Sequence, residues 1–370
     1  RMVHNFEWVK NRLDPDGLLN PGKIVRAPKM DDRSLFRYGT GYSVPEMDTV
    51  FDWAGYSGAG RGFQGAVEMC NNNGACRKLK GGTMCPSFRV TRKEKDLTRG
   101  RANTLRLAIS GQLGPDALTS DEMADTMKLC VSCKGCKREC PTGVDMAAMK
   151  IEVQAARARK HGLRLHDRLV AYLPRYAPWA ARLPLIANLR NTVPGLAKLT
   201  ERLSGFTASR DLPKWSARPF KDTEAEQNAA PGAVLFADCF NRYFEPENLR
   251  ATLNVLGAAK VPVQIAAAPK GERPLCCGHT FLSAGLVDEA RTEARRLVDA
   301  LLPFAEQGLP IIGLEPSCLL TLRDEIPAML PGADTALLAR QARMLEEYIA
   351  DQDGDPAFQL PLVSPAPRIL

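Results

Sequence analysis

The segment Cys130-Val-Ser-Cys133-Lys-Gly-Cys136-Lys-Arg-Glu-Cys140-Pro141 is the most informative stretch of this sequence. Its C-x2-C-x2-C-x3-C-P spacing is typical of loops that bind cubane iron–sulfur clusters. The first three thiolates can turn inward from one tight loop and bind three corners of a cluster. Cys140, which Pro141 holds, points away, so we expect it to serve a second cluster.

A second cysteine group provides the partners that this wiring requires. It comprises Cys70-Asn-Asn-Asn-Gly-Ala-Cys76 and Met84-Cys85-Pro86. Crossed ligation predicts one complete site for a [4Fe-4S] cluster, with the ligands Cys85, Cys130, Cys133 and Cys136. The other site takes Cys70, Cys76 and Cys140, and Asn73 stands where a fourth cysteine would be. There we expect either a [3Fe-4S] cluster or a [4Fe-4S] cluster with a non-thiolate ligand.

Two alternatives stay open for these seven cysteines. In a different wiring, Cys85 joins Cys70 and Cys76. A zinc site is the other alternative, although zinc prefers paired C-x2-C ligands with a long spacer. Eleven cysteines, an odd number, argue against a disulfide framework. The stretch 60–65 matches G-x-G-x-x-G, but no βαβ unit surrounds it, so we interpret it as a flexible approach to the cluster loop.

The composition limits the class of protein. With 370 residues, of which 45% are apolar and 25% charged, the chain is expected to form two or three globular domains. No apolar run approaches about 18 residues, so we expect no transmembrane helix. Because the chain begins at Arg1 and stops at a strand-like pair, Ile369-Leu370, we expect it to be a piece of a longer protein.

Charge is distributed unevenly along the chain. Residues 1–220 carry 37 Lys and Arg against 21 Asp and Glu, whereas residues 221–370 carry 13 against 21. We expect no nucleic-acid partner, because cluster thiolates would offset the basic charge and the 6% aromatic residues form no stacking platform. Lys134, Lys137 and Arg138 lie beside the ligands and are predicted to raise the cluster potential by favouring the reduced form.

Strands and helices alternate from residue 233 onward. The predicted strands are 234–237, 261–265 and 310–314, and the predicted helices include about 281–306 and about 334–349. This order predicts a parallel sheet that is covered on both faces.

Four further cysteines follow these strands at the carboxyl edge of the sheet: Cys239, Cys276, Cys277 and Cys318. Open α/β sheets bind ligands at this edge, so the four thiols are expected to converge on one crevice. Gly278 permits the turn that lets both adjacent cysteines face one metal centre. The site holds iron–sulfur, zinc or no metal in this fragment, and the alternative is that the cysteines are small buried core residues. His279 is either a further ligand or simply solvated.

These motifs resemble the C-terminal portion of bacterial FAD-binding and (Fe-S)-binding oxidoreductases, which are related to FAD-linked D-lactate and D-2-hydroxyglutarate dehydrogenases. Leu13-Asp-Pro-Asp-Gly-Leu-Leu-Asn-Pro-Gly-Lys23-Ile looks like the end of their FAD-linked oxidase domain. Residues 68–87 and 130–141 resemble their double-cluster domain. The segment Cys276-Cys277-Gly278, together with Cys239 and Cys318, resembles one cysteine-rich CCG repeat of the heterodisulfide-reductase B type.

The resemblance implies a mixed fold, in which a mostly α-helical, ferredoxin-like double [4Fe-4S] domain precedes an α/β parallel-sheet CCG domain. The implied parts are the tail of an FAD-linked oxidase domain, the double-cluster domain, a helical linker region and a first, truncated CCG repeat, over residues 1–30, 31–160, 161–231 and 232–370. Two features depart from the family. Cys318 lacks the usual C-x-x-C partner, and no second CCG repeat follows it.

The implied parent is an FAD-linked D-2-hydroxy acid dehydrogenase, an oxidoreductase whose FAD lies in a domain of the same polypeptide. Its iron–sulfur clusters, with a third metal centre at the CCG site, would relay electrons to a quinone, a flavoprotein or a cytochrome. We expect neither the substrate site nor FAD ligands in this chain. The alternatives are an electron-transfer subunit of a heterodisulfide-reductase-like enzyme and a non-catalytic metal-binding scaffold.

The expected location is the cytoplasm. Residues 163–206 mix Leu, Pro and Trp179 with many Arg. We interpret this segment as a packed linker between domains, and the alternative is a basic amphipathic surface that contacts the inner face of the membrane.

Overall fold

The computed structural model describes residues 2–32, 34, 42–43, 46–56, 60–225, 230–352, 355, 358 and 360. The predicted strand-like end at residues 369–370 therefore lies outside the described residues. The chain divides into two compact units, Arg1–Glu46 and Met47–Leu370.

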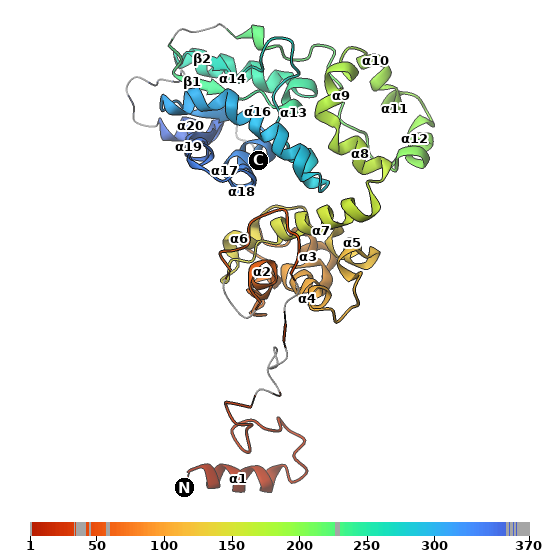
Figure 1. The fold of residues 1–370 in the computed structure, drawn as a ribbon, viewed down its shortest axis with the longest axis vertical. Helices are drawn as coiled ribbons and strands as arrows, with labels where there is room; N and C mark the ends of the chain where they lie inside the picture. Colours follow the sequence, from red (N-terminus) through yellow and green to blue (C-terminus); the bar gives the residue numbers. More distant parts are fainter. Residues whose placement is uncertain are drawn as a thin grey trace, which may run out of the picture. The chain divides into compact units, whose positions relative to one another are not determined.

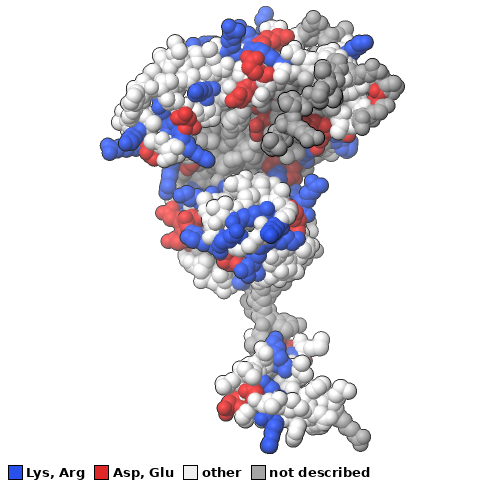
Figure 2. Space-filling view, turned by 180° about the vertical axis from the view of Figure 1, so that it is seen from behind, with Lys and Arg blue, Asp and Glu red and all other residues white. Residues whose placement is uncertain are grey.

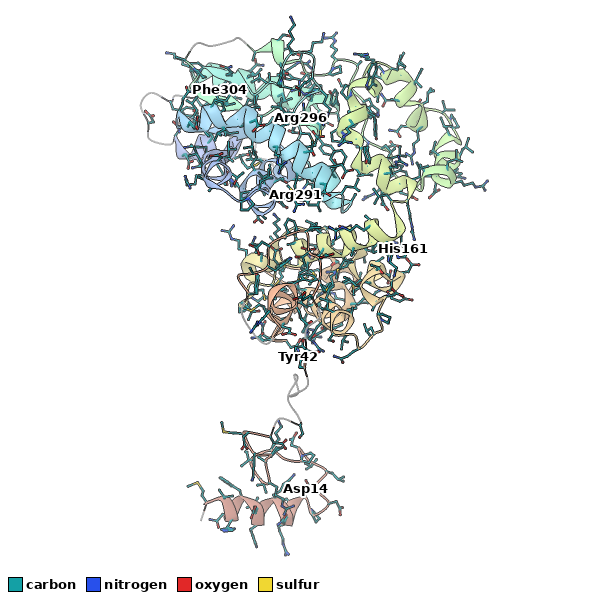
Figure 3. The ribbon with its side chains drawn as sticks, viewed as in Figure 1. Asp14, Tyr42, His161, Arg291, Arg296 and Phe304 are labelled. Carbon is teal, nitrogen blue, oxygen red and sulfur yellow. The ribbon has the colours of Figure 1, made fainter. Side chains whose placement is uncertain are left out.

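The first unit contains one helix, α1 (Met2–Leu13), among the residues described for it. The carboxylate of Asp14, at the end of this helix (Figure 3), accepts hydrogen bonds from the backbone N–H groups of Leu18 and Leu19 at 2.9 Å. These bonds order the turn that the resemblance assigns to an oxidase domain.

The second unit begins with a helical region (Figure 1). Its helices are α2 (Gly62–Glu68), α3 (Pro86–Thr91), α4 (Thr98–Ile109), α5 (Asp121–Lys128), α6 (Gly135–Glu139) and α7 (Met146–His161). Side chains define where two of them begin, because Ser120 accepts from the N–H of Met123 at 3.2 Å and Asp145 accepts from that of Ala148 at 3.0 Å. The cysteine segments lie in or beside the turns between these helices, and Cys136 belongs to α6 itself.

Short helices follow α7: α8 (Leu165–Ala171), α9 (Leu173–Ala180), α10 (Pro184–Ala187), α11 (Leu189–Thr192) and α12 (Leu196–Ser204). Pro174 and Pro184 occupy the first turns of α9 and α10, where the missing N–H costs nothing. Neither α10, α11 nor α12 contains a buried residue, so these helices expose apolar side chains.

The last region is a four-stranded parallel sheet of order β2-β1-β3-β4. Its strands are β1 (Ala233–Leu235), β2 (Val263–Ile265), β3 (Ile311–Gly313) and β4 (Ala342–Met344). The helices are α13 (Cys239–Tyr243), α14 (Pro246–Ala258), α15 (His279–Ser283), α16 (Val287–Glu306), α17 (Pro316–Arg323), α18 (Glu325–Met329), α19 (Ala333–Gln341) and α20 (Leu345–Asp351). In the register, Val234 faces Gln264 on one side and Ile311 on the other.

Successive residues of β1 enter different cores, as the alternation of a strand requires. Val234 belongs to the core that includes Leu297 of α16 and Leu338 of α19. Leu235 belongs to the core that includes Leu249 of α14 and Tyr348 of α20. Helices therefore cover both faces of the sheet, as predicted.

The long helix α16 also connects the sheet region to the helical region. Arg291, which lies on α16 with Arg296 and Phe304 (Figure 3), donates to the backbone carbonyl of Val50 at 2.6 Å. Glu293 of the same helix is fully buried and pairs with Arg296 at 3.0 Å. A buried carboxylate requires such a partner, because an unpaired charge in the interior is costly.

Three predicted details were wrong. The helix predicted over 334–349 is two helices, α19 and α20, with β4 between them. The helix predicted over 281–306 is interrupted at Gly285, whose φ of +81° and whose approach to the backbone of Gln154 leave no room for a Cβ atom. The glycine stretch 60–65 does not form a flexible approach, because α2 begins at Gly62 and buries Phe63.

Candidate metal centres

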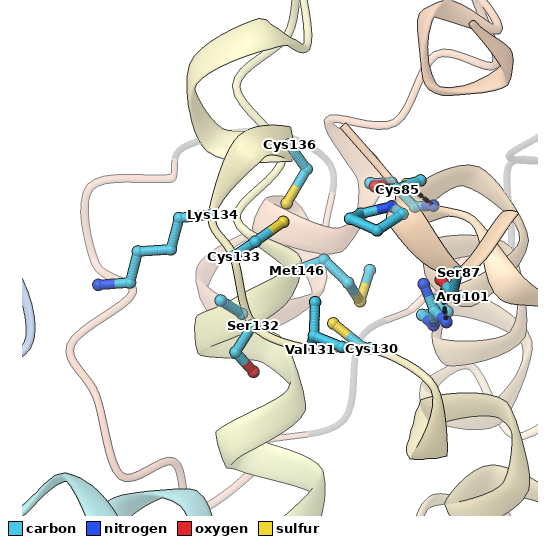
Figure 4. Close-up of a pocket in the computed structure, with 13 residues that line it drawn as sticks. Cys85, Ser87, Arg101, Cys130, Val131, Ser132, Cys133, Lys134, Cys136 and Met146 are labelled. Carbon is cyan, nitrogen blue, oxygen red and sulfur yellow. Dashed lines mark hydrogen bonds between the residues drawn. The ribbon is translucent and has the colours of Figure 1, made fainter. Parts of the chain in front are cut away.

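Four cysteines from two separate segments line one pocket in the helical region (Figure 4). They are Cys85, Cys130, Cys133 and Cys136. Cys85 and Cys136 are buried, Cys130 is half-buried and Cys133 is exposed, so the pocket opens to solvent beside Cys133. This is the set that the crossed wiring predicts for the complete cluster.

Unusual backbone conformations shape this pocket. Cys85, Ser132 and Lys134 all have positive φ angles, of 52°, 55° and 57°. Non-glycine residues rarely adopt this region, and such strain is concentrated at functional sites. Gly135 adds a close approach, because a Cβ atom there would lie 3.2 Å from the backbone nitrogen of Met84. A larger residue at this position would crowd Met84, so glycine favours the close approach of the two cysteine segments.

Glu139, between Cys136 and Cys140, fastens the same two segments together. Its carboxylate accepts hydrogen bonds from the backbone N–H of Thr83 at 2.6 Å and from that of Met84 at 3.2 Å. The Thr83 N–H bond is the main reason why the pKa of Glu139 lies below its usual value. No feature of the sequence marked Glu139 as part of the site.

Hydrogen bonds and burial define the chemistry of the sulfur atoms. The backbone N–H of Thr98 donates to the Sγ atom of Cys85 at 3.1 Å. Burial raises the pKa of Cys85, and it raises the pKa of Cys136 to about 12. Thiols that hold their protons this tightly bind as thiolates only when a cationic centre compensates the buried charge. The donor set therefore fits an iron–sulfur cluster.

The cysteines predicted for the second cluster lie in the same region. Cys70 and Cys76 are buried, and burial raises the pKa of Cys76 to about 11. Cys140 is half-buried; burial opposes ionisation, but hydrogen bonds from Thr142 and from the N–H of Val144 lower its pKa. The proximity of Cys140 to the other two stays a prediction.

Asn73, the residue at the position of the missing cysteine, has local partners. Its side-chain oxygen accepts from the N–H of Ala75 at 2.8 Å, and its amide nitrogen donates to Asn71 at 2.6 Å. Both polar atoms of the side chain therefore stabilise the turn between Cys70 and Cys76.

The four cysteines of the sheet region form a continuous row of contacts. Hydrogen bonds between side chains join Cys239 to Cys276, Cys276 to Cys277, and Cys277 to Cys318. All four are buried, with 2–4% of their surface exposed. Cys239 begins α13, the first helix after β1, and Cys318 lies in the first turn of α17, the first helix after β3. The carboxyl edge of the sheet thus assembles the group.

Cys276 is the distinctive thiol of this row. Its pKa is lowered, because Cys239, Cys277 and the N–H of Gly278 direct hydrogen bonds at its sulfur. Gly278 makes this possible, since its φ is +81° and a Cβ atom there would lie 2.8 Å from the carbonyl oxygen of Ala290. Any residue larger than glycine would clash with this carbonyl oxygen at position 278.

His279 is not simply solvated. Its Nδ1 atom lies 3.2 Å from the hydroxyl of Thr321, and burial lowers its pKa.

Within the described part of the chain, no three or more His, Cys, Asp or Glu side chains have the arrangement of a single-ion site. Zinc would draw its four sulfurs to within about 4 Å of one another. A cluster places each thiolate on a different iron, so its ligand sulfurs lie further apart than those of a zinc site.

The family comparison agrees with the helical region. Residues 66–144 match the family model of the 4Fe-4S dicluster domain. The chain therefore contains a dicluster iron–sulfur domain, which is the class of protein that the pocket and its cysteines indicate.

The curated relatives are D-2-hydroxyglutarate dehydrogenases. The chain is 26% identical to that of Escherichia coli (strain K12) over 86% of its own length, and 26% identical to that of Pseudomonas putida over 91%. It is 24% identical to that of Pantoea ananatis over 89%. The chain spans 35–37% of the length of these relatives. The resemblance predicted from the cysteine motifs is thereby confirmed.

No solved structure matches the chain significantly. Among the helices that the structure describes, none is long and apolar enough to cross a membrane.

Proposed function

We propose that this chain is the electron-transfer part of a flavin-dependent 2-hydroxy acid dehydrogenase of the D-2-hydroxyglutarate or D-lactate type. One observation carries the proposal: Cys85 joins Cys130, Cys133 and Cys136 around one pocket. FAD would be bound by an oxidase domain of the same polypeptide, outside this fragment. The acceptor would be a quinone, a flavoprotein or a cytochrome.

In this proposal, the described cysteines have separate tasks. Cys85, Cys130, Cys133 and Cys136 hold a [4Fe-4S] cluster, and Cys70, Cys76 and Cys140 hold a [3Fe-4S] or [4Fe-4S] cluster. When bound, such clusters accept and release one electron at a time, which matches the ability of flavin to pass on an electron pair in single steps. Hydrogen bonds to the ligand sulfurs tune the potential of a cluster. Thr98 supplies one to Cys85, and Thr142 lies within 3.3 Å of the Sγ atom of Cys140.

The arrangement of the parts is included in the proposal. Residues 31–160 would form the ferredoxin-like double-cluster domain, and residues 232–370 one CCG repeat that binds a third metal centre through its four cysteines. Residues 1–30 would be the tail of the oxidase domain, and residues 161–231 would be a helical linker. The compactness of Met47–Leu370 is consistent with direct contact between the two cysteine-rich regions.

Iron and sulfide analysis with EPR on anaerobically prepared protein tests this function. We expect about seven or eight iron atoms per chain for the two clusters, with signals that appear and disappear on reduction. More iron would occupy the CCG site. A redox-silent zinc protein would overturn the proposal and favour the metal-binding scaffold.

The contact row of four cysteines supports a second candidate, the electron-transfer subunit of a heterodisulfide-reductase-like enzyme. Adjacent thiols in contact can exchange between dithiol and disulfide states. Alkylation and mass spectrometry after mild oxidation would then find a disulfide within the row. If all four thiols are still present after mild oxidation and react with the alkylating agent only once the metal has been removed, no disulfide has formed and this candidate is contradicted.

A peripheral membrane contact is also proposed, for α9–α12. Trp179, Leu185 and Leu203 have exposed fractions of 66%, 85% and 69%. Figure 2 shows a largely uncharged surface on this side of the molecule, with Lys and Arg around it. Anionic vesicles should therefore retain the protein in flotation, and Leu185→Ser with Leu203→Ser should release it. Equal binding to neutral and anionic vesicles would contradict the contribution of the Lys and Arg side chains to this contact.

A further inference from the structure

A lysine of the cluster loop is held by two carboxylates from a distant part of the sequence. The side chain of Lys134 leaves the cysteine pocket (Figure 4). Its amino group lies 2.5 Å from the carboxylate of Asp324 and 2.6 Å from that of Glu325. Lys137 pairs with Asp324 at 2.7 Å and with Asp145 at 3.1 Å. We call Asp324 and Glu325 the carboxylate latch.

The latch lies close to the four-cysteine row. Asp324 ends α17, the helix that carries Cys318, and Glu325 begins α18. Thr321 of α17 reaches His279, which follows the Cys276–Gly278 turn directly. The same short segment therefore touches both candidate metal centres, one through its carboxylates and the other through Thr321 and Cys318.

Burial gives these ion pairs more weight than surface pairs have. The side chain of Glu325 is only 10% exposed, and those of Lys134 and Asp324 are 24% and 33% exposed. Burial by itself would raise the pKa of Asp324, but the two lysines hold that pKa below its usual value. A buried charge that loses its partner destabilises the folded state. Lys134 and Lys137 are therefore expected to stay paired with the two carboxylates of the latch.

The charges of the latch also act on the cluster. A reduced cluster carries one more negative charge than an oxidised one, so a nearby cation raises the potential and a nearby anion lowers it. The sequence predicts that Lys134 and Lys137 raise the potential. Since carboxylates neutralise both lysines, their effect in the folded protein is largely cancelled.

We infer that Asp324 and Glu325 are positioning residues that fix the cluster loop against the four-cysteine domain and lower the potential of the cluster held by Cys85, Cys130, Cys133 and Cys136. This inference rests on the proposed function, because it requires the cluster. It assigns the contact between the two cysteine-rich regions to specific residues that no motif marks.

Redox titration monitored by EPR tests the latch in the full chain, reconstituted anaerobically. The double variant Asp324→Asn/Glu325→Gln should raise the midpoint potential by the equivalent of about a tenfold change in the reduction equilibrium, or about 59 mV for one electron. Lys134→Gln should lower it, whereas Lys134→Arg should leave it unchanged. Adding Lys134→Gln to the double variant should cancel part of the rise.

Asp351→Asn is the matched control, because it removes a carboxylate that pairs with Arg343 at 3.0 Å elsewhere in the same domain. The control should leave the potential unchanged. If the double variant binds iron normally and its potential equals that of the control, the latch is overturned while the proposed function stands. If the double variant loses its iron, the midpoint potentials of Lys134→Gln and Lys134→Arg test the latch instead. Equal potentials in these two variants would overturn it.

Iron analysis of the unsubstituted chain separates the two proposals. A chain that binds no iron would overturn the proposed function itself, before any variant is compared. Limited proteolysis provides a second readout, because the double variant should be cleaved faster between residues 134 and 324 than the control. Equal cleavage of the two would contradict the positioning role.

Discussion

The two cysteine groups of the second unit differ in how they are assembled. Three cysteines of the pocket, Cys130, Cys133 and Cys136, come from one short segment, and Cys85 comes from another. The row in the sheet region draws on three segments that are spread from Cys239 to Cys318, and two of its cysteines lie in helices, Cys239 in α13 and Cys318 in α17. The first group is therefore mainly a local structure, whereas the second exists only after a parallel sheet has formed.

The two groups also differ in their access to solvent. Cys133 is exposed at the pocket, while every cysteine of the row is buried. An exposed cluster edge suits electron exchange with a partner, and an enclosed group suits chemistry that water would disturb. The carboxylate latch lies between these two environments.

The largest expected effect is a loss of iron from one cysteine group that leaves the other group unaffected. Cys136→Ser should remove a cluster, with a loss of about four iron atoms per chain. Cys277→Ser should leave the EPR signals of the dicluster domain intact, because the pocket does not include it. Iron analysis and EPR compare the two variants. If both variants lose the same amount of iron, the two cysteine groups do not form independently.

The next effect tests how the buried row is assembled. Gly278→Ala introduces a Cβ atom 2.8 Å from the carbonyl oxygen of Ala290 at a φ of +81°. We expect the free energy of unfolding to fall by about 2–5 kcal/mol, from backbone strain together with overpacking.

Gly308→Ala is the control for this glycine. Its φ is +77°, but nothing lies within 4 Å of the added atom, so only the strain of about 1–2 kcal/mol is expected. Denaturant unfolding measures both variants. If both lose the same stability, the close approach at Gly278 has no role in holding the row.

A smaller effect tests the local character of the cluster region. Ser120 caps α5, the helix that leads into the cysteine loop, by accepting from the N–H of Met123. Ser120→Ala should cost about 1 kcal/mol of unfolding free energy. Ser110→Ala removes a 3.4 Å bond to the carbonyl of Leu107 and a 2.9 Å bond from the side chain of Gln112, but it uncaps no helix N-terminus, so it should cost less. A larger loss from the second variant would contradict the cap.

The smallest effect concerns pH and the helix that carries Cys318. A hydrogen bond from Arg323 lowers the pKa of Glu347 to about 2. A lowered carboxyl pKa stabilises the fold above the usual value of 4.5, and the gain is lost as the pH falls towards 2. Glu347→Gln should cost at most about 1 kcal/mol at pH 7, because the pair is partly exposed. The same variant should match the parent near pH 2 in acid unfolding, and a constant difference would contradict the linkage.

Motif spacing predicts the composition of the cysteine pocket, because it groups Cys85 with Cys130, Cys133 and Cys136. Hydrophobic runs located three of the four strands to within two residues at either end. They missed β4, because Ala342, Arg343 and Met344 lie between two helical patterns and have no strand signature of their own. Only pairing with β3 makes this segment a strand.

Residues that act through long-range contacts were beyond such analysis. Glu139, Asp324 and Glu325 are ordinary acidic residues in the sequence, and their roles depend on which N–H or amino group the fold brings to them. The effect of Lys134 on the potential depends in the same way on its pairing with Asp324 and Glu325. Charge can be counted along the chain, but its effect depends on distance.

The amino-acid sequence alone thus predicted the four cysteines of the pocket, the division of the cysteines into groups and the resemblance to D-2-hydroxyglutarate dehydrogenases, since metal-binding chemistry is encoded in residue type and short spacing. The contact row from Cys239 to Cys318, the left-handed turns at the pocket and the pairing of Lys134 with Asp324 and Glu325 emerged only in the folded chain. Packing decides which distant groups meet, and no local pattern records those distances.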